Sequence, residues 1–506
     1  MKTQSRTKGI AISYLTTIVR TLSRLILTPL YLKVLGIDGY GFYQYIFSVA
    51  SYATILDFGI SSVVNTFSIK HKEQGNTKGV ENVMFYALMF SVGAALLIVL
   101  GGVIIIVEAP GIFGEVVLKN LALTRMLLAI ITTELIILMF QHYFEGVILA
   151  SEKYVTLRSV SLVQILIRSI VTVLLLYSNL GVLSIALGDC IGVIICLCFE
   201  IYYCRTKIGL KIRYRFYDPG LIRGIAKLSL ALCLQSVVSY LNSSIDKYVL
   251  GRYLSTVAVT IYTVAVTFSV FFDEIPTVIQ RLYLPQVVKL VESGADGEQL
   301  TDFVIRPGRY QFMLVGGVLG AFILFGRQFI SMWSGAETAE AWQIALLLMV
   351  PSVLPLIQNV CLSILTAMNK RMFRSYVLCG IAIANLFLTV FLVEKIGIMG
   401  APIGTFIALV LGNNIAMNWY YKKVIGINVG RLFKSILYKL LPCAMLATCV
   451  CGTLLFVPYS GVIWFVSECI IYCIVYAVFL WMIGMNNEER YWIRSKVERL
   501  IRRKNS

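Results

Sequence analysis

Residues 83–107 read VMFYALMFSVGAALLIVLGGVIIIV and contain no charged side chain. A helix needs about 20 consecutive apolar residues to cross the hydrocarbon core of a bilayer. Similar apolar runs recur along the whole chain, so we expect an all-α polytopic membrane protein with about fourteen transmembrane helices. The expected helices are, approximately, residues 10–32, 40–68, 80–107, 118–150, 155–177, 181–204, 228–250, 255–288, 304–332, 340–367, 372–393, 398–421, 434–456 and 461–484.

The composition agrees with a membrane protein. The 506 residues are 58% hydrophobic and 14% charged, with a mean hydropathy of +0.83, whereas a soluble protein carries roughly 25% charged residues. In a soluble protein a net charge of +18 would suggest nucleic acid as a partner. Here we assign the basic residues to cytoplasmic loops beside anionic membrane lipids, and we expect no nucleic-acid partner. The twelve cysteines lie in apolar runs without ligand-spaced His or carboxylates, so we expect no metal, disulfide or cofactor.

Lysine and arginine are concentrated in every second loop. The loops between them hold only scattered cases such as Lys33 and Lys395. The positive-inside rule therefore predicts a multi-pass membrane protein with both termini cytoplasmic, and the basic start followed by a long apolar run predicts a retained first helix. The basic segments are residues 2–8, 70–78, 153–158, 205–227, 370–374 and 422–439.

Three landmarks recur at an offset of 215 or 216 residues, which indicates an internal duplication. The matched pairs are Gly36 with Gly251, Arg158 with Arg374, and Gly181 with Gly397. Six helices per repeat is an even number, so the two halves enter the membrane from the same side as a parallel repeat, and such transporters place the substrate route between the halves. The expected segments are an N-terminal lobe (1–206), a basic cytoplasmic linker (207–227), a C-terminal lobe (228–425), two extra helices (426–485) and a charged tail (486–506) with Trp492 and Ile493 on its apolar side.

The first helix of each half carries a polar stripe at helical spacing. Polar side chains that face lipid cost free energy, so we expect both stripes to line a hydrophilic cavity. The alternative is that these side chains form hydrogen bonds that hold neighbouring helices together. The first stripe is Ser13, Thr17, Arg20, Arg24, Thr28 and Tyr31, and the second is Gln235, Ser239, Asn242 and Asp246.

Arg20 and Arg24 are the sharpest feature of the sequence. Arginine stays protonated and offers forked donors that match phosphate oxygens, so these residues favour an anionic substrate such as a pyrophosphate or an acidic sugar. An internal ion pair with Asp57 is the alternative. Arg168 and Arg281 are further candidates for the same substrate site. Membrane carboxylates such as Asp57, Glu134 and Asp246 could couple transport to a proton or sodium gradient, but none is singled out.

Several stretches resemble bacterial polysaccharide-transport flippases of the multidrug/oligosaccharidyl-lipid/polysaccharide exporter superfamily. They are YLKVLGIDGYGFY at 31–43, LDFGI at 56–60, LTAMNK at 365–370 and GIMGAPIG at 397–404. The resemblance covers nearly the whole chain and implies two six-helix lobes around a cavity, with Arg20 and Arg24 among its lining residues. It implies movement of undecaprenyl-pyrophosphate-linked sugar units to the outer face by alternating access, with the lipid-linked oligosaccharide, membrane lipids and a polysaccharide polymerase as partners.

Two other functions compete with a flippase. A cation-coupled drug exporter of the same superfamily would have a more acidic or aromatic cavity. A membrane-embedded glycosyltransferase or polymerase would need catalytic residues on sizeable outward loops, and the expected outward loops are short. No phosphate-binding G-x-x-x-x-G-K-[ST] loop is present, so the chain is not itself an ATP-driven pump.

Overall fold

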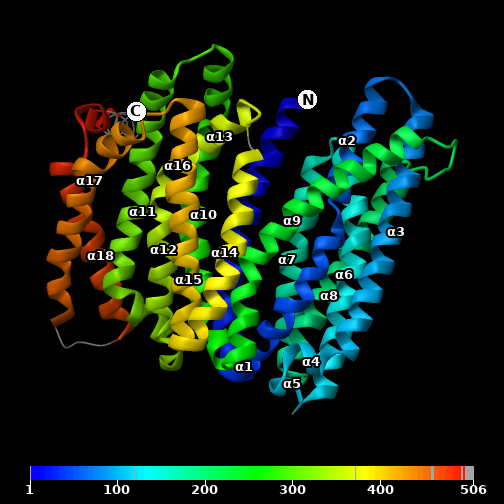
Figure 1. The fold of residues 1–506 in the computed structure, drawn as a ribbon, viewed down its shortest axis with the longest axis horizontal. Coiled ribbons are helices and arrows are strands. Elements are labelled where there is room, and N and C mark those ends of the chain that lie inside the picture. Colours follow the sequence, from blue (N-terminus) through cyan, green and yellow to red (C-terminus); the bar gives the residue numbers. More distant parts are fainter. Residues whose placement is uncertain (1, 119, 371, 457–460, 492–493, 496–506) are drawn as a thin grey trace, which may run out of the picture. The chain divides into compact units, whose positions relative to one another are not determined.

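The computed structural model describes residues 2–118, 120–370, 372–456, 461–491 and 494–495, and this part of the chain is helical without β-strands (Figure 1). The predicted all-α fold class is confirmed. Trp492, Ile493 and residues 496–506 of the predicted tail lie outside the described residues.

The helices of the first part of the chain are α1 (Lys2–Ala50), η1 (Ser51–Asp57), α2 (Ile60–Glu73), α3 (Thr77–Val107), α4 (Ala109–Phe113), α5 (Glu115–Leu118), α6 (Leu121–Ala150), α7 (Tyr154–Leu176), α8 (Leu183–Tyr203), η2 (Cys204–Ile208) and α9 (Pro219–Tyr253). They are followed by α10 (Thr256–Glu292), α11 (Gly297–Ser334), η3 (Ala336–Thr338), α12 (Ala341–Ile357), α13 (Asn359–Ala367), α14 (Met372–Ile396), η4 (Gly397–Met399), α15 (Gly400–Leu409), η5 (Val410–Ala416), α16 (Met417–Tyr420), η6 (Tyr421–Ile425), α17 (Val429–Gly452), η7 (Thr453–Phe456), α18 (Val462–Phe479) and η8 (Leu480–Gly484).

Eleven helical segments of the described chain are long and apolar enough to cross a membrane, or up to twelve if α12 and α13, which bend by 49°, form one span. Two of these segments, at 59 and 54 residues, are long enough for two crossings each. Gly36 breaks the first with φ 72° and ψ 172°, and Gly397, with φ 65°, interrupts the second. A polytopic membrane protein is therefore confirmed, and the count of fourteen crossings stays a prediction.

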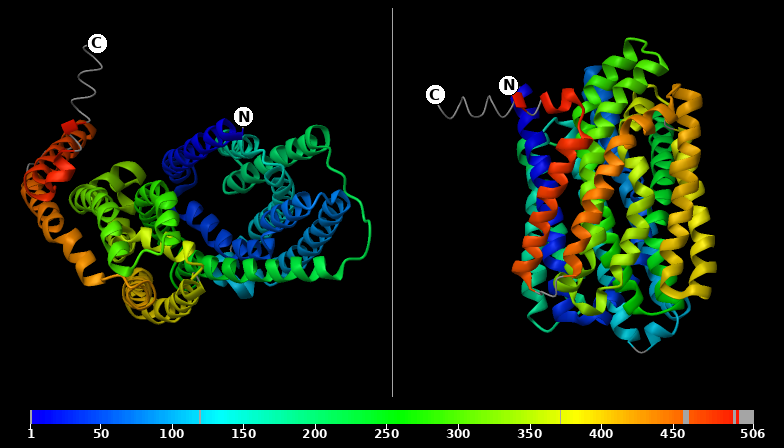
Figure 2. Two further views of the ribbon diagram at one scale, coloured as in Figure 1. Left: turned by 90° about the horizontal axis from the view of Figure 1, so that it is seen from above. Right: turned by 90° about the vertical axis from the view of Figure 1, so that its left-hand side faces the viewer.

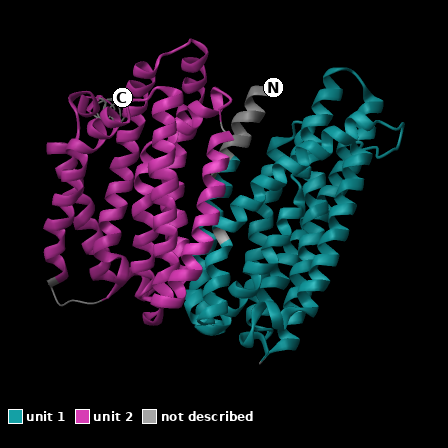
Figure 3. Ribbon diagram, viewed as in Figure 1, with its two compact units in different colours: residues 1–260 teal, residues 261–506 magenta. Residues whose placement is uncertain are grey.

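The chain divides into two compact units, residues 1–260 and 261–506 (Figure 3). The helix expected at 228–250 is longer than predicted, because α9 begins at Pro219, where the side chain of Asp218 accepts a hydrogen bond from the Leu221 N–H at 2.9 Å. This helix packs against α1, α2, α3 and η1 of the first unit.

Each unit has its own apolar core. In the first unit Val63, Val83 and Ile225 are buried between α2, α3 and α9. In the second unit the buried side chains come mainly from α11, α13, α17 and α18. Large apolar side chains also remain exposed on the spanning helices, such as Leu100 of α3 at 61%, and a lipid environment accommodates this surface without a folding penalty.

One kind of helix ending occurs in both halves of the chain. The π-turn η2 ends at Gly209 (φ 68°), where the Leu210 N–H bonds back to the Cys204 carbonyl at 2.9 Å. The π-turn η6 ends at Gly426 (φ 78°), where the Ile427 N–H bonds to the Tyr421 carbonyl at 3.3 Å. Glycine suits both left-handed positions because it has no Cβ.

Two more turns recur in the same way. Glu152 (φ 57°) and Asn369 (φ 55°) each precede a lysine whose N–H bonds to a carbonyl five residues earlier, at 3.2 and 2.8 Å. Gly75 (φ 67°) and Gly294 (φ 75°) close the turns before α3 and α11. Corresponding turns in the same chain order are what the predicted duplication requires.

Candidate functional site

Helix α1 has two exposed faces along residues 15–26. At 3.6 residues per turn the two stripes lie on opposite sides of the helix. The apolar stripe suits lipid, whereas each guanidinium at the centre of a bilayer costs roughly 2.5–3.5 kcal/mol, so the polar stripe requires water or a polar ligand. The exposed apolar side chains are Leu15, Ile18, Leu22 and Ile26, and the exposed polar ones are Thr17, Arg20 and Arg24.

The predicted polar stripe continues into the protein. Thr28 is 5% exposed and Tyr31 7% exposed, so the last part of the stripe is buried rather than solvent-facing. The neighbouring face of α1 packs on α7, where the Ser23 and Ser169 hydroxyls are 2.9 Å apart. This contact fixes the polar stripe of α1 beside the segment of α7 that carries Arg168.

Arg168 is held by α8 through an ion pair between its Nε and Asp189 Oδ1. Asp189 is buried, whereas 49% of the Arg168 side chain is exposed. The Tyr43 hydroxyl also donates to Asp189 Oδ2, at 3.5 Å. The carboxylate therefore fixes the direction of the guanidinium, and among the described residues no hydrogen-bond partner is found for its terminal nitrogens.

A chain of polar contacts connects α9 with α1. The Lys247 Nζ donates to Gln44 Oε1 at 3.1 Å, and the Gln44 Nε2 donates to the Tyr40 hydroxyl at 3.1 Å. The Tyr40 ring stacks on Tyr31 with centroids 5.8 Å apart. Three different helical segments, on the two sides of the Gly36 break and on α9, thus meet around Tyr40.

Two arginines lie near this tyrosine, and Lys247 connects to it through Gln44. Arg24 and Arg168 lie within electrostatic range of Tyr40, and Arg24 also lies within range of Lys247. We call Arg24, Arg168 and Lys247 the cationic cluster. All three belong to candidate membrane spans or their continuation in the first unit, where charge–charge interactions are stronger than in water. Such a cluster matches the oxygens of a phosphate or carboxylate.

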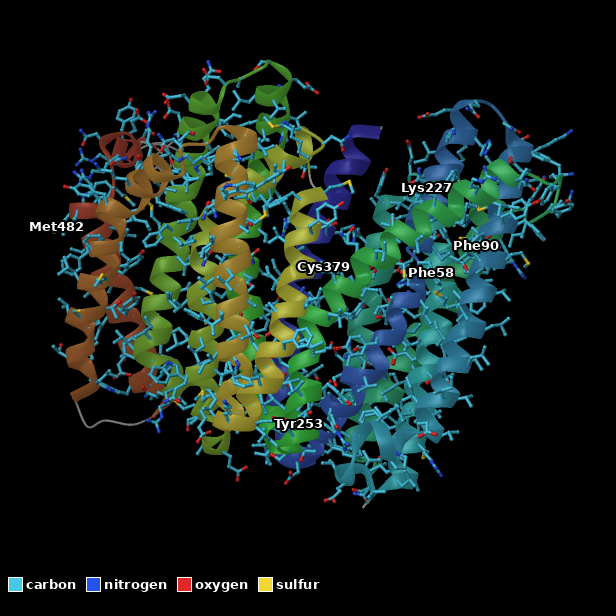
Figure 4. All side chains as sticks on the ribbon, viewed as in Figure 1. Phe58, Phe90, Lys227, Tyr253, Cys379 and Met482 are labelled. Atoms are coloured by element: carbon cyan, nitrogen blue, oxygen red, sulfur yellow. The ribbon has the colours of Figure 1, made fainter. Side chains whose placement is uncertain are left out.

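The predicted polar residues of α9, whose course is marked by Lys227 and Tyr253 in Figure 4, have mixed environments. Gln235 and Ser239 are exposed, Asn242 is half-buried and Asp246 is 3% exposed. Ser239 and Asn242 hydrogen-bond to carbonyls of their own helix, at 3.1 and 2.9 Å. Lys247, which was not among the predicted site residues, supplies the contact to Gln44.

Asp57, at the end of η1, lies 2.9 Å from His142 of α6, measured from Oδ1 to Nδ1. Both side chains are about one-third exposed or less, at 30% and 28%. Phe58 (φ 50°, Figure 4) and Gly59 (φ 61°) then take left-handed conformations that separate η1 from α2. The structure therefore gives Asp57 a histidine partner that the sequence did not suggest.

Arg281 belongs to α10 in the second unit, where its side chain is exposed. The preceding residue, Gln280, donates to the Ser363 hydroxyl at 3.1 Å and so ties this part of α10 to α13. Within the described residues, no three His, Cys, Asp or Glu side chains are grouped so that they could hold a metal ion.

A model of the polysaccharide biosynthesis protein family matches residues 6–284, more than half of the chain. The chain belongs to this family. It is 23% identical to "Uncharacterized membrane protein EpsK" of Bacillus subtilis, over 92% of both chains. It is 21% identical to the "Putative O-antigen transporter" of Shigella flexneri, over 78% of this chain and 92% of that protein. It is also 25% identical to "Probable flippase AglR" of Haloferax volcanii, where the match spans about half of each chain.

Solved structures of two transporters share the fold. The lipid II flippase MurJ in an inward closed conformation matches with a TM-score of 0.74 and 14% identity, over 93% of this chain and 98% of that one. An inward-facing multidrug resistance transporter of the MATE family matches with a TM-score of 0.62 and 16% identity, over 80% and 93%. The predicted polysaccharide-transport family is confirmed, and the chain shares the fold of a MATE transporter of the MOP superfamily. Two of the three relatives carry the names of a flippase and a transporter, as predicted, rather than names of enzymes.

Proposed function

We propose that this polysaccharide biosynthesis protein is a flippase. It moves undecaprenyl-pyrophosphate-linked oligosaccharide repeat units from the cytoplasmic to the outer face of a bacterial plasma membrane by alternating access, and it serves the assembly of a surface polysaccharide. The family, the flippase and transporter names of its relatives and the MurJ-like fold support the proposal.

The observation that carries the proposal is the cationic cluster within the membrane-spanning part of the first unit. A pyrophosphate has to cross a medium in which an isolated charge is expensive. Arg24, Arg168 and Lys247 would replace its hydration with charge-assisted hydrogen bonds, while the prenyl tail stays in lipid. Two of the three cations are arginines, whose planar fork matches phosphate oxygens.

The sugar requires neutral polar partners as well as cations. Exposed side chains of the first unit supply them beside the cluster, and the exposed Arg281 of the second unit is a further contact in this proposal. The proposed substrate-contacting residues are Thr17, Arg20, Arg24, Asp57, Arg168, Gln235, Ser239, Asn242, Lys247 and Arg281, whereas the predicted Thr28, Tyr31 and Asp246 are buried.

Net movement would draw on a proton or sodium gradient. The Asp57–His142 pair at 2.9 Å is the proposed place of exchange, because histidine is the side chain that titrates nearest neutral pH. In reconstituted vesicles the two ions are distinguished by whether a proton gradient or a sodium gradient accelerates translocation.

The purified protein in vesicles tests the proposal directly. A fluorescent short-chain polyprenyl-pyrophosphate oligosaccharide is placed in both leaflets, and a membrane-impermeant quencher reports how fast the inner pool becomes accessible. We expect accessibility to rise well above that of protein-free vesicles, and the matching polyprenyl alcohol without pyrophosphate to show no acceleration. Equal rates with and without protein would refute a flippase, and equal acceleration of the alcohol would refute recognition through the cationic cluster.

A further inference from the structure

A basic extended segment connects α8 with α9. We call residues 209–217 the basic strap, and Figure 2 shows it as a long loop between these two helices. It starts at Gly209, which ends η2 in a left-handed conformation, and stops at the Asp218 cap of α9. Every side chain from Lys211 to Tyr217 is exposed.

The end of the strap nearest α9 is fixed to the first turns of α3. The Phe216 carbonyl accepts hydrogen bonds from Asn82 Nδ2 at 3.1 Å and from the Tyr86 hydroxyl at 3.3 Å. Arg215 forms an ion pair with Glu81, and the Tyr214 ring packs edge-on against Phe85 with centroids 5.4 Å apart. This end of the strap therefore has a defined place at the starts of α3 and α9.

The preceding residues are not fixed in this way. Lys211, Ile212 and Arg213 alternate between basic and apolar side chains, and an extended chain turns such neighbours to opposite sides. Within the described part of the chain, no hydrogen bond is found for the backbone N–H groups of residues 211–214. Such backbone cannot enter hydrocarbon, so the strap lies in the headgroup and water zone beside the ends of two candidate spans.

We propose that the basic strap binds anionic phospholipid headgroups at the membrane boundary. Lys211 and Arg213 offer cations to the phosphates, and exposed Arg205 and Lys207 of η2 add to the same field. Ile212 (37% exposed) and Tyr217 (71% exposed) supply the apolar and aromatic groups that settle at a bilayer interface. The fixed end at Phe216 holds the strap at this level.

Hydrogen–deuterium exchange of the full chain in lipid nanodiscs tests this surface. We expect the amides of residues 211–214 to exchange about fivefold more slowly in nanodiscs containing phosphatidylglycerol than in pure phosphatidylcholine, the change that one basic side chain near a charged surface gives. Salt of about 1 M, which shortens the Debye length to about 3 Å, is expected to remove the difference.

Two variants make the test specific. The double substitution K211Q/R213Q is expected to abolish the lipid dependence. K422Q/K423Q removes two exposed cations from the corresponding turn η6 and is expected to leave it intact. Equal exchange in the two lipids, or slow exchange that persists in K211Q/R213Q, would overturn the proposal. Slow exchange in native membrane vesicles but not with purified phosphatidylglycerol would also overturn it, in favour of an acidic protein partner.

Discussion

Lys247 holds a central position among the residues of the candidate site, because it reaches Gln44 and lies near Arg24. We expect Lys247→Met to lower the initial rate of pyrophosphate-lipid translocation by roughly tenfold, the loss of about 1.4 kcal/mol that one charge-assisted hydrogen bond supplies, and Lys247→Arg to retain most of it. The rate is measured in the vesicle assay with equal amounts of folded protein. Lys423→Met, an exposed cation over Trp419, is the control, and an unchanged rate in Lys247→Met would remove this residue from the site.

The Arg168–Asp189 pair has a structural consequence that can be separated from transport. Asp189→Asn leaves a half-exposed guanidinium without its anionic partner, so we expect a loss of about 1–3 kcal/mol of stability, less than for a fully buried pair. Arg168→Gln combined with Asp189→Asn is expected to recover much of this loss. Thermal unfolding in detergent gives both values, and additive effects of the two single changes would contradict a coupled pair.

The environments of the candidate site residues were predictable from the sequence to different degrees. The exposure of Thr17, Arg20 and Arg24 on one face was predictable from their helical spacing. An arginine in a membrane-spanning helix is costly against lipid, so its side chain turns toward water or a polar partner. The position of Lys247 beside Gln44 could not be predicted from the sequence. It depends on which helices pack together, and the two residues are about 200 positions apart in the chain. Whether the predicted site residues contact substrate stays a prediction.

At the scale of elements, one arginine ties α17 and the segment after α18 to α11. Arg309 Nε and Nη2 bind the two carboxylate oxygens of Glu489 at 2.7 and 2.9 Å, while Nη1 and Nη2 bind the Ser435 and Gly484 carbonyls at 3.0 and 2.7 Å. Both charged side chains are less than one-tenth exposed. The network joins α11 to α17, to η8 after α18 and to the start of the tail.

Glu489→Gln leaves a buried guanidinium without its counter-charge, which costs about 3–5 kcal/mol. We therefore expect a lower unfolding midpoint and faster proteolysis after residue 484. Glu488→Gln changes the neighbouring exposed carboxylate and is expected to have neither effect. Similar midpoints for the two variants would show that the ion pair does not anchor the C-terminal helices.

Two glycines at corresponding places allow close helix packing in each half. A Cβ on Gly188 would meet Thr172 of α7, and a Cβ on Gly404 would lie 3.0 Å from Thr389 of α14. We expect Gly188→Ala and Gly404→Ala to destabilise the protein, whereas Gly380→Ala, with nothing within 4 Å, is expected to be neutral or stabilising by up to about 1 kcal/mol. Unfolding midpoints in detergent check the signs, and stabilisation at Gly188 would contradict the close packing.

Most helix positions were predictable within several residues because each apolar run is long. The single helices expected at 40–68 and 340–367 were wrong, because η1 with the left-handed Phe58 and Gly59 divides the first and a bend of 49° between α12 and α13 divides the second. The start of α9 at Pro219 was missed, since its first turns are basic and polar and are decided by the Asp218 cap. The π-turns η2 and η6 were also missed, because hydropathy carries no information on hydrogen-bond register, although Gly209 and Gly426 mark both ends.

For the whole molecule, the predicted topology requires that the chain turns back at Gly36 and at Gly397, so that each long helical segment crosses the membrane twice. In a background without the twelve native cysteines, we expect Lys33→Cys and Lys395→Cys to react with a membrane-impermeant maleimide from outside the cell, since both precede these breaks. Lys72→Cys and Lys423→Cys are expected to react only after permeabilisation. Labelling of all four cysteines from the same side would contradict this topology and would indicate that each long helical segment crosses the membrane only once.

The turns shared by the two halves also have a consequence for the origin of the chain. A stretch with an even number of crossings returns to the side on which it started, so a second copy fused behind it inserts in the same orientation without an adaptor. A half-length ancestor could therefore have worked as two separate subunits before its gene was joined head to tail. If the predicted duplication holds, the left-handed glycines at 209 and 426 would mark where each ancestral copy finished its last helix.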